Sequence, residues 1–167
     1  ADVPPGANGI TFLPYLQGAS GSKINDKARG VFIGMSLGTK KADMARAVME
    51  GISFEVYDII NAELEAGIKI NSIRLTGGAA KSPMWCQMLA DIFKLPIQLL
   101  SAGETGCLGA ALYAGIGVGA YENCRDAAEK AVKLTEVFEP DPEKFAAYDK
   151  AYQRFINVYN ALDNRIF

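Results

Sequence analysis

The stretch that decides the fold is "RLTGGAAKSPMWCQMLADIF", residues 74–93. The apolar residues before its two glycines have strand composition, and the chain then turns sharply at Gly77-Gly78. Ser82 stands where a helix N-cap is expected, and Pro83 takes the first helical position, where a missing N–H is tolerated. The stretch therefore predicts a strand, a glycine bend and an amphipathic helix in direct succession.

The bend at Gly77-Gly78 predicts room beside the main chain. Glycine has no Cβ, so a ligand can approach the backbone, and positive φ is permitted. The following helix offers N–H groups and the positive end of its dipole, which suit a phosphate or ribose-phosphate. The alternative is a plain strand-to-helix turn with a good cap, because the motif is neither GxGxxG nor GxxxxGK[ST]. The residues alone leave both interpretations open.

A second turn rich in small residues, "SAGETGCLGAA", begins at residue 101. It brings Gly103, Thr105 and Gly106 to the end of the next expected strand, where ligands of open α/β sheets gather. The alternative is tight packing of a helix on the sheet, since several glycines in one helix indicate a close neighbour. Residues 107–121 are too short for a membrane span, so we expect a tightly packed core helix there.

Hydrophobic periodicity organises the rest of the chain. Asp43 as N-cap and Gly67 as C′ residue would bound a long helix. Its apolar stripe would be Met44, Val48, Ile52, Val56, Ile59 and Leu64. A terminal helix after "EPDPEK" would bury Phe145, Tyr148, Tyr152, Phe155, Tyr159 and Leu162. With short strands expected near residues 9–16, 31–36, 71–76 and 96–100, the pattern predicts an α/β domain with a parallel or mixed sheet.

Composition excludes several classes of function. The 167 residues carry 17 basic and 19 acidic side chains without a basic block, so we expect no nucleic-acid or membrane partner. Histidine is absent, which excludes Ser-His and Cys-His catalysis within this chain. Three cysteines without CxxC spacing indicate buried thiols in a reducing cytoplasm, and the first residues lack signal-peptide character. We assign no catalytic residue and no metal ligand here.

Three segments in order, residues 28–56, 75–97 and 104–119, resemble the C-terminal, ATP-binding domain of the FGGY carbohydrate kinases. The resemblance extends from about Gly9 to the last helix and is closest to the pentulose kinases. Departures are Gly18-Ala19-Ser20, where many members carry Gly-Glu-Arg, and Thr39, where a histidine often stands.

The resemblance implies a partial ribonuclease-H-like domain of the actin, sugar kinase and Hsp70 superfamily. Residues 1–167 would be a single C-terminal domain, with the sugar-binding domain outside this sequence. The implied activity is transfer of the ATP γ-phosphoryl group to a sugar hydroxyl, of a pentulose such as xylulose. Gly77, Gly78 and Ala79 would line the adenosine and α-phosphate side of ATP, and Ser82 would lie near the adenine.

The resemblance also implies what this chain lacks. The catalytic aspartate, the phosphate-gripping hairpin and most groups that hold Mg²⁺ would lie in preceding sequence, so we expect the chain alone to be inactive. One alternative is a non-catalytic nucleotide-sensing or actin-like module, and another is an interaction domain in which the bend is structural. An apolar sheet edge exposed by truncation would drive artificial homodimers.

Overall fold

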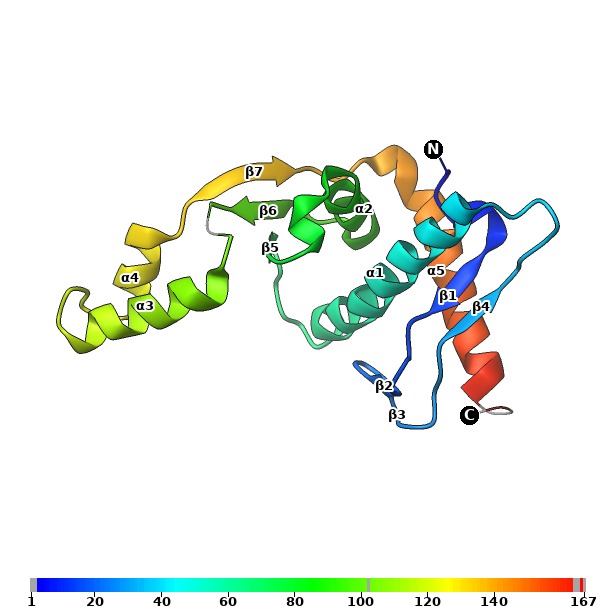
Figure 1. Cartoon of the computed structure of the whole chain (residues 1–167), viewed down its shortest axis with the longest axis horizontal. Helices are drawn as coiled ribbons and strands as arrows, with labels where there is room; N and C mark the ends of the chain where they lie inside the picture. The colour runs from blue at the N-terminus through cyan, green and yellow to red at the C-terminus, as the bar shows by residue number, and fades with distance from the viewer. Residues whose placement is uncertain (1–2, 102, 164–165, 167) are drawn as a thin grey trace.

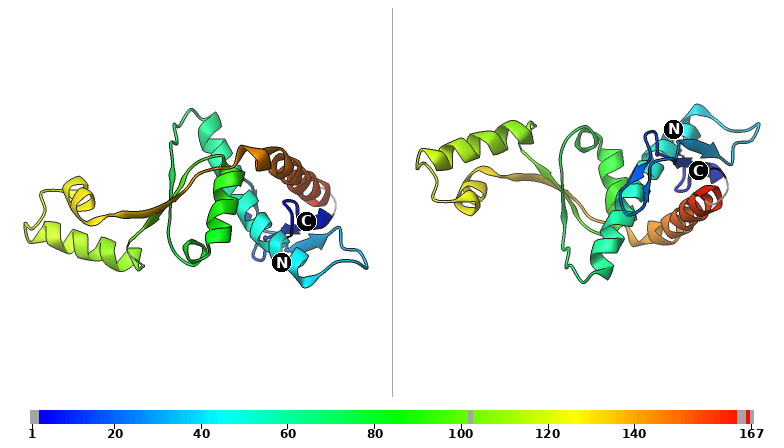
Figure 2. Two further views of the ribbon diagram at one scale, coloured as in Figure 1. Left: turned by 90° about the horizontal axis from the view of Figure 1, so that it is seen from above. Right: turned by 90° about the horizontal axis from the view of Figure 1, so that it is seen from below.

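The computed structural model describes residues 3–101, 103–163 and 166 (Figure 1). Three helices pack together at one end: α1 (Lys41–Glu65), α2 (Pro83–Phe93) and α5 (Pro142–Asp163). We call these helices, with the strands that pack on them, the body. Two further helices, α3 (Thr105–Gly117) and α4 (Cys124–Ala131), pack on each other and project from the body as an arm. Both views of Figure 2 keep the arm apart from α1 and α5.

The strands form three small sheets. The antiparallel pairs join β1 (Thr11–Leu13) to β4 (Val31–Ile33) and β2 (Ala19–Ser20) to β3 (Ile24–Asn25). The third sheet has the order β5 (Ile73–Leu75), β6 (Ile97–Leu100), β7 (Leu134–Phe138), with β5 parallel and β7 antiparallel to β6. Short 3₁₀ turns are η1 (Ala7–Gly9) and η2 (Ala79–Lys81). The predicted α/β class with a mixed sheet is confirmed, whereas β2, β3 and β7 were not expected.

The N-terminus of α1 differs from the prediction. Lys40 is the N-cap, and Asp43 is the third helical residue. The Asp43 carboxylate accepts hydrogen bonds from the Lys40 N–H at 2.8 Å and the Asn8 amide at 2.9 Å. Asp43 therefore reaches back to satisfy the helix start, as the acidic partner in a capping box does. Gly67 follows the helix end with φ +86°, as predicted for a C′ residue.

The buried face of α1 is not the predicted apolar stripe. Ile52, Val56 and Ile59 are each more than a third exposed. The face that packs into the body contains Ala47, Glu50, Gly51, Ser53 and Phe54. Small residues on this face let β1 come close, because a Cβ added to Gly51 would lie 2.3 Å from the Phe12 carbonyl oxygen.

The predicted stripe of α5 is confirmed. Tyr148, Phe155 and Tyr159 are buried, and the intervening aromatic Tyr152 packs against the same core. The Phe155 ring lies 5.7 Å from that of Phe54 on α1, between centroids. Aromatic packing thus joins α5 to α1.

The prediction of a core helix at residues 107–121 is wrong. No residue of α3 is buried, and Tyr113 is 70% exposed. Cys107 and Cys124 are also exposed, so the prediction of buried thiols holds only for Cys86. Among the described residues, no helix combines the length and apolar character that crossing a membrane requires.

Candidate functional site

The glycine bend lies between β5 and η2, and its two glycines differ in backbone conformation. Gly77 has φ +83°, a region that side chains other than glycine rarely adopt. Gly78 has φ −63° and ψ −41°, ordinary right-handed helical values that any residue adopts. The turn itself therefore requires glycine at position 77 and not at position 78.

Space around the bend is open on its outer side. Both glycines are exposed, and a Cβ added to either would have no atom within 4 Å among the described residues. Neither amide donates a hydrogen bond within the described part of the chain. Consequently, neither the backbone nor packing against these residues accounts for the glycine at position 78.

The start of α2 has the predicted cap. The Ser82 hydroxyl oxygen accepts a hydrogen bond from the Trp85 N–H at 3.4 Å, and Pro83 occupies the first helical position. The N–H of Ser82 bonds the Ala79 carbonyl, which closes the single turn of η2. Six residues thus carry the chain from the end of β5 to a capped helix N-terminus.

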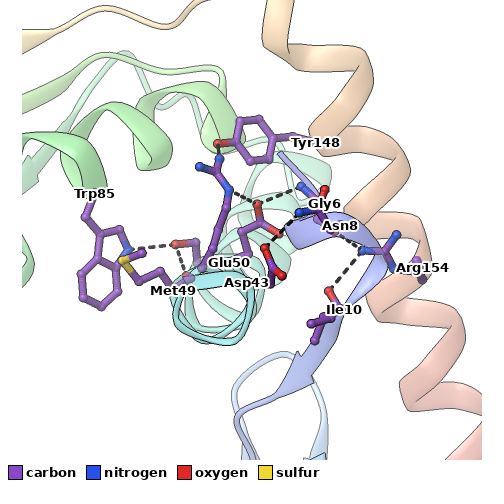
Figure 3. Close-up of polar contacts among 11 residues, drawn as sticks. Gly6, Asn8, Ile10, Asp43, Met49, Glu50, Trp85, Tyr148 and Arg154 are labelled. Carbon is purple, nitrogen blue, oxygen red and sulfur yellow. Dashed lines mark hydrogen bonds and ion pairs between the residues drawn. The ribbon is translucent and has the colours of Figure 1, made fainter. Parts of the chain in front are cut away.

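The Cys86 side chain contacts the inner side of the bend, and the side chain of its neighbour Trp85 joins α2 to α1. The buried Cys86 thiol donates towards the carbonyl oxygens of Ala79 at 3.6 Å and Ala80 at 3.8 Å. Burial raises the pKa of this thiol, which keeps it protonated and able to donate at neutral pH. The Trp85 indole N–H donates to the Ser53 hydroxyl oxygen at 3.1 Å, which links α2 to α1 (Figure 3).

The mixed sheet brings the two predicted turns to one edge. Because β5 and β6 are parallel, with Leu75 opposite Leu99, the bend at Gly77 and the turn at Gly103 leave from the same side. The arm begins at this edge. A cavity of about 330 Å³ starts at Met84 in the first turn of α2 and continues towards α5, but residues 77–82 do not line it. The bend is therefore open to solvent and lies outside this cavity.

A buried polar cluster around Glu50, which lies three residues before Ser53 on α1, holds this helix in place (Figure 3). The Glu50 carboxylate accepts hydrogen bonds from the Arg46 guanidinium at 2.8 Å and the Gly6 N–H at 2.9 Å. Arg46 also donates to the Tyr148 hydroxyl on α5 at 2.6 Å. Burial raises the pKa of the Glu50 carboxyl, opposed by Arg46, and raises that of Tyr148 to about 12. These contacts attach α1 firmly to α5 and to the N-terminal segment.

The structure groups the predicted site residues Gly77, Gly78, Ala79 and Ser82 in one bend. Sequence reasoning did not identify Ser53 or Cys86 as residues behind that bend. A signal for Ser53 exists in its position, since it lies among the small residues Ala47 and Gly51 on the buried face of α1. Nothing in the sequence pairs it with Trp85.

Residues 1–118 match the sequence profile of a family described as the FGGY family of carbohydrate kinases, C-terminal domain. A xylulose kinase from Staphylococcus epidermidis is 42% identical over 154 residues, which cover 92% of this chain and 31% of that protein. The L-xylulose/3-keto-L-gulonate kinase of Escherichia coli is 35% identical over 162 residues, covering 97% and 32%. The chain thus spans about a third of the length of these relatives.

A solved structure shares the fold over the same extent. The ligand-bound xylulose kinase from Lactobacillus acidophilus superimposes with a TM-score of 0.87 at 32% identity, covering 98% of this chain and 33% of that one. This similarity confirms the predicted fold class, a partial domain of the actin, sugar kinase and Hsp70 superfamily with a C-terminal helix. The family profile matches more than half of the length of this chain. We therefore conclude that the chain belongs to the FGGY family of carbohydrate kinases, in the region of their C-terminal domain.

Proposed function

We propose that the protein carrying this chain is an ATP-dependent carbohydrate kinase, and that residues 77–82 form one wall of its nucleotide site. The sugar that we propose is a pentulose such as xylulose, because two of the relatives described above are named for xylulose. The sugar-binding domain and the catalytic base would lie outside these 167 residues. We accordingly expect the chain alone to bind nucleotide weakly and to transfer nothing.

Gly78 is the observation that carries the proposal. Its helical φ and ψ would accept any side chain, and no described atom lies within 4 Å of an added Cβ. A glycine with neither a conformational nor a packing reason is explained if a ligand approaches the main chain there. The exposed amides of the bend and the capped start of α2 supply donors and a positive dipole for an anion.

Different residues of the bend would contact different parts of the nucleotide. Gly77, Gly78 and Ala79 would face the adenosine and the α-phosphate, and the Ser82 hydroxyl proton would be available to the adenine, because its oxygen already accepts from the Trp85 N–H. Among the described residues we find no cluster of acidic or sulfur ligands for a metal. Mg²⁺ bound to the ATP phosphates would neutralise part of their charge during in-line transfer.

This chain would contribute to catalysis by holding the nucleotide still. Phosphoryl transfer depends mainly on positioning and electrostatic stabilisation, so a fixed nucleotide wall lowers the barrier without touching the reacting atoms. A cytoplasmic location would give such an enzyme its ATP. Closure of the sugar-binding domain over this wall would exclude water and limit wasteful ATP hydrolysis.

The test is steady-state kinetics of the full-length protein with Gly78→Asp and Gly78→Ala as a matched pair. Sugar-dependent ADP release would be measured with xylulose, gluconate and glycerol. Both substitutions suit the helical backbone at position 78. A carboxylate near a phosphate is repelled by several kcal/mol at an effective dielectric constant of about 20, so Gly78→Asp should raise KM for ATP by at least about tenfold. Gly78→Ala should raise it less.

The two kinds of failure are distinguishable. Sugar-dependent ADP release by the wild type with an unchanged KM in Gly78→Asp would retain the kinase and remove the bend from its nucleotide site. ATP binding without transfer to any sugar would instead favour a nucleotide-sensing module. Circular dichroism of both variants checks that the fold is intact.

A further inference from the structure

We infer that Trp85 and Ser53 are positioning residues for the nucleotide wall: the hydrogen bond between them sets where the glycine bend lies relative to the body. This inference rests on the proposed function of residues 77–82. Neither side chain needs to touch the nucleotide. Their role would be to hold the backbone that does.

The connection runs through three consecutive hydrogen bonds. The Trp85 main-chain N–H bonds the Ser82 hydroxyl at 3.4 Å, and its indole N–H bonds the Ser53 hydroxyl at 3.1 Å. Ser53 in turn donates its own proton to the Met49 carbonyl at 2.7 Å. One residue, Trp85, is therefore held at its backbone by the bend and at its side chain by α1.

The α1 end of this connection is rigidly placed. Ser53 is fully buried, and Glu50, one turn earlier, accepts hydrogen bonds from Arg46 and from the Gly6 main chain. Arg46 continues to Tyr148 on α5. The helix that offers the acceptor to Trp85 is thus attached to the N-terminal segment and to α5, which makes it a firm reference point for α2.

At its other end, the connection reaches a bend that few other contacts hold in place. Its outer side is open around both glycines, and η2 is a single 3₁₀ turn. From inside, the side-chain support that remains among the described residues is Cys86, whose thiol is a weak donor at 3.6 Å or more. Loss of the indole bond should therefore let the first turn of α2 shift, and with it the amides of residues 77–82.

A purely packing role for Trp85 would predict a different response. The ring does contact the core cluster, and phenylalanine would preserve much of that contact. Phenylalanine cannot donate the hydrogen bond, and alanine at position 53 cannot accept it. Two chemically different substitutions should therefore produce the same defect in nucleotide binding.

The experiment measures the Kd for ADP of the full-length protein by calorimetry, for Trp85→Phe, Ser53→Ala and the double variant. Each single change should weaken ADP binding by about 3- to 10-fold, the range expected for one lost hydrogen bond. The double variant should bind ADP about as tightly as the single variant with the higher Kd, because both changes remove the same hydrogen bond. KM for ATP should rise while kcat at saturating ATP changes less than about twofold.

Tyr15→Phe is the matched control. It removes a hydroxyl hydrogen bond of 2.7 Å to Glu55, also on α1, and should reduce stability while leaving the Kd for ADP unchanged. If the wild type binds ADP and both variants bind it equally well, the positioning role is overturned and the proposed function stands. If the wild type binds neither ADP nor ATP, both are overturned. Should Trp85→Phe fail to fold, Ser53→Ala alone decides between these outcomes.

Discussion

The body and the arm each contain an arginine four residues before a glutamate on a helix. In α1 the pair is Arg46–Glu50, with the two side chains 14% and 2% exposed. In α4 it is Arg125–Glu129, with the side chains 89% and 69% exposed. The sequence spacing is identical, yet the first pair belongs to a buried network and the second lies in solvent.

The glycines of the two regions differ in the same way. In α1 a Cβ on Gly51 would collide with the main chain of Phe12, whereas in α3 a Cβ on Gly109 would have no described atom within 4 Å. Helical glycine indicates close approach of a neighbour, and in α1 that neighbour is β1 of the same chain. The comparison teaches that a helical glycine is required by close packing in the body, whereas in the arm it only weakens the helix.

The largest expected effect on stability comes from removing the glutamate of each ion pair. Glu50→Ala should lower the free energy of unfolding by about 3–5 kcal/mol, because it leaves Arg46 and the Gly6 N–H without their buried acceptor. Glu129→Ala should change it by no more than about 0.5 kcal/mol. Urea unfolding of both variants measures the difference, and equal effects would show that burial does not distinguish the two pairs.

The next effect concerns Gly51 in α1. Gly51→Ala should lower the free energy of unfolding by about 1–3 kcal/mol, since the added methyl group meets backbone that cannot rotate away. Thermal and urea unfolding provide the measurement. An unchanged stability would mean that β1 moves from α1 at no cost, contrary to the close contact seen here.

A third prediction uses pH to sharpen the role of Asp43 at the start of α1. The Lys40 N–H, followed by the Asn8 amide, holds the pKa of the Asp43 carboxyl below its usual 3.8. The stability that the ionised Asp43 carboxylate gives to the folded state is therefore fully present above about pH 4. It is lost as the pH falls through the lowered pKa. Asp43→Ala should lower Tm by about 2–4 °C at pH 7, and the gap from wild type should shrink below pH 4. A gap that stays constant down to pH 2 would contradict the assignment.

The smallest effect has the opposite sign. Gly109→Ala should raise the free energy of unfolding by about 0.5–1 kcal/mol, because α3 gains a better helix former without a clash. Differential scanning calorimetry of this chain, with Gly51→Ala alongside, gives the direct comparison. Destabilisation by Gly109→Ala would reveal a close neighbour of α3 in solution.

The positions of the main helices were largely predictable from the sequence. The face of α1 that is buried was not. Periodicity identified α1 and α5, and the Ser82-Pro83 signal identified the start of α2. The apolar stripe through Ile52, Val56 and Ile59 nevertheless pointed to the wrong face of α1, because the packed face is built from small and polar residues around Gly51. Burial depends on what packs against a helix, and that information lies in distant segments.

Strand β7 and the residues behind the bend show a second limit. Most of β7 is exposed and is held by main-chain pairing with β6, so no alternation of apolar residues marks it. The bend was predictable because glycine and the cap act locally. The pairing of Trp85 with Ser53 joins residues 32 apart, and no local pattern encodes it.

The connection between β6 and β7 has a consequence for how such domains can diverge. Leu100 lies opposite Leu134, and the Ser101 N–H bonds the Lys133 carbonyl at 2.9 Å. The arm therefore departs and returns at a single closed point, like an insertion in a hairpin. An intervening module of different length or sequence could be grafted there while the strand register and the path into α5 stay the same.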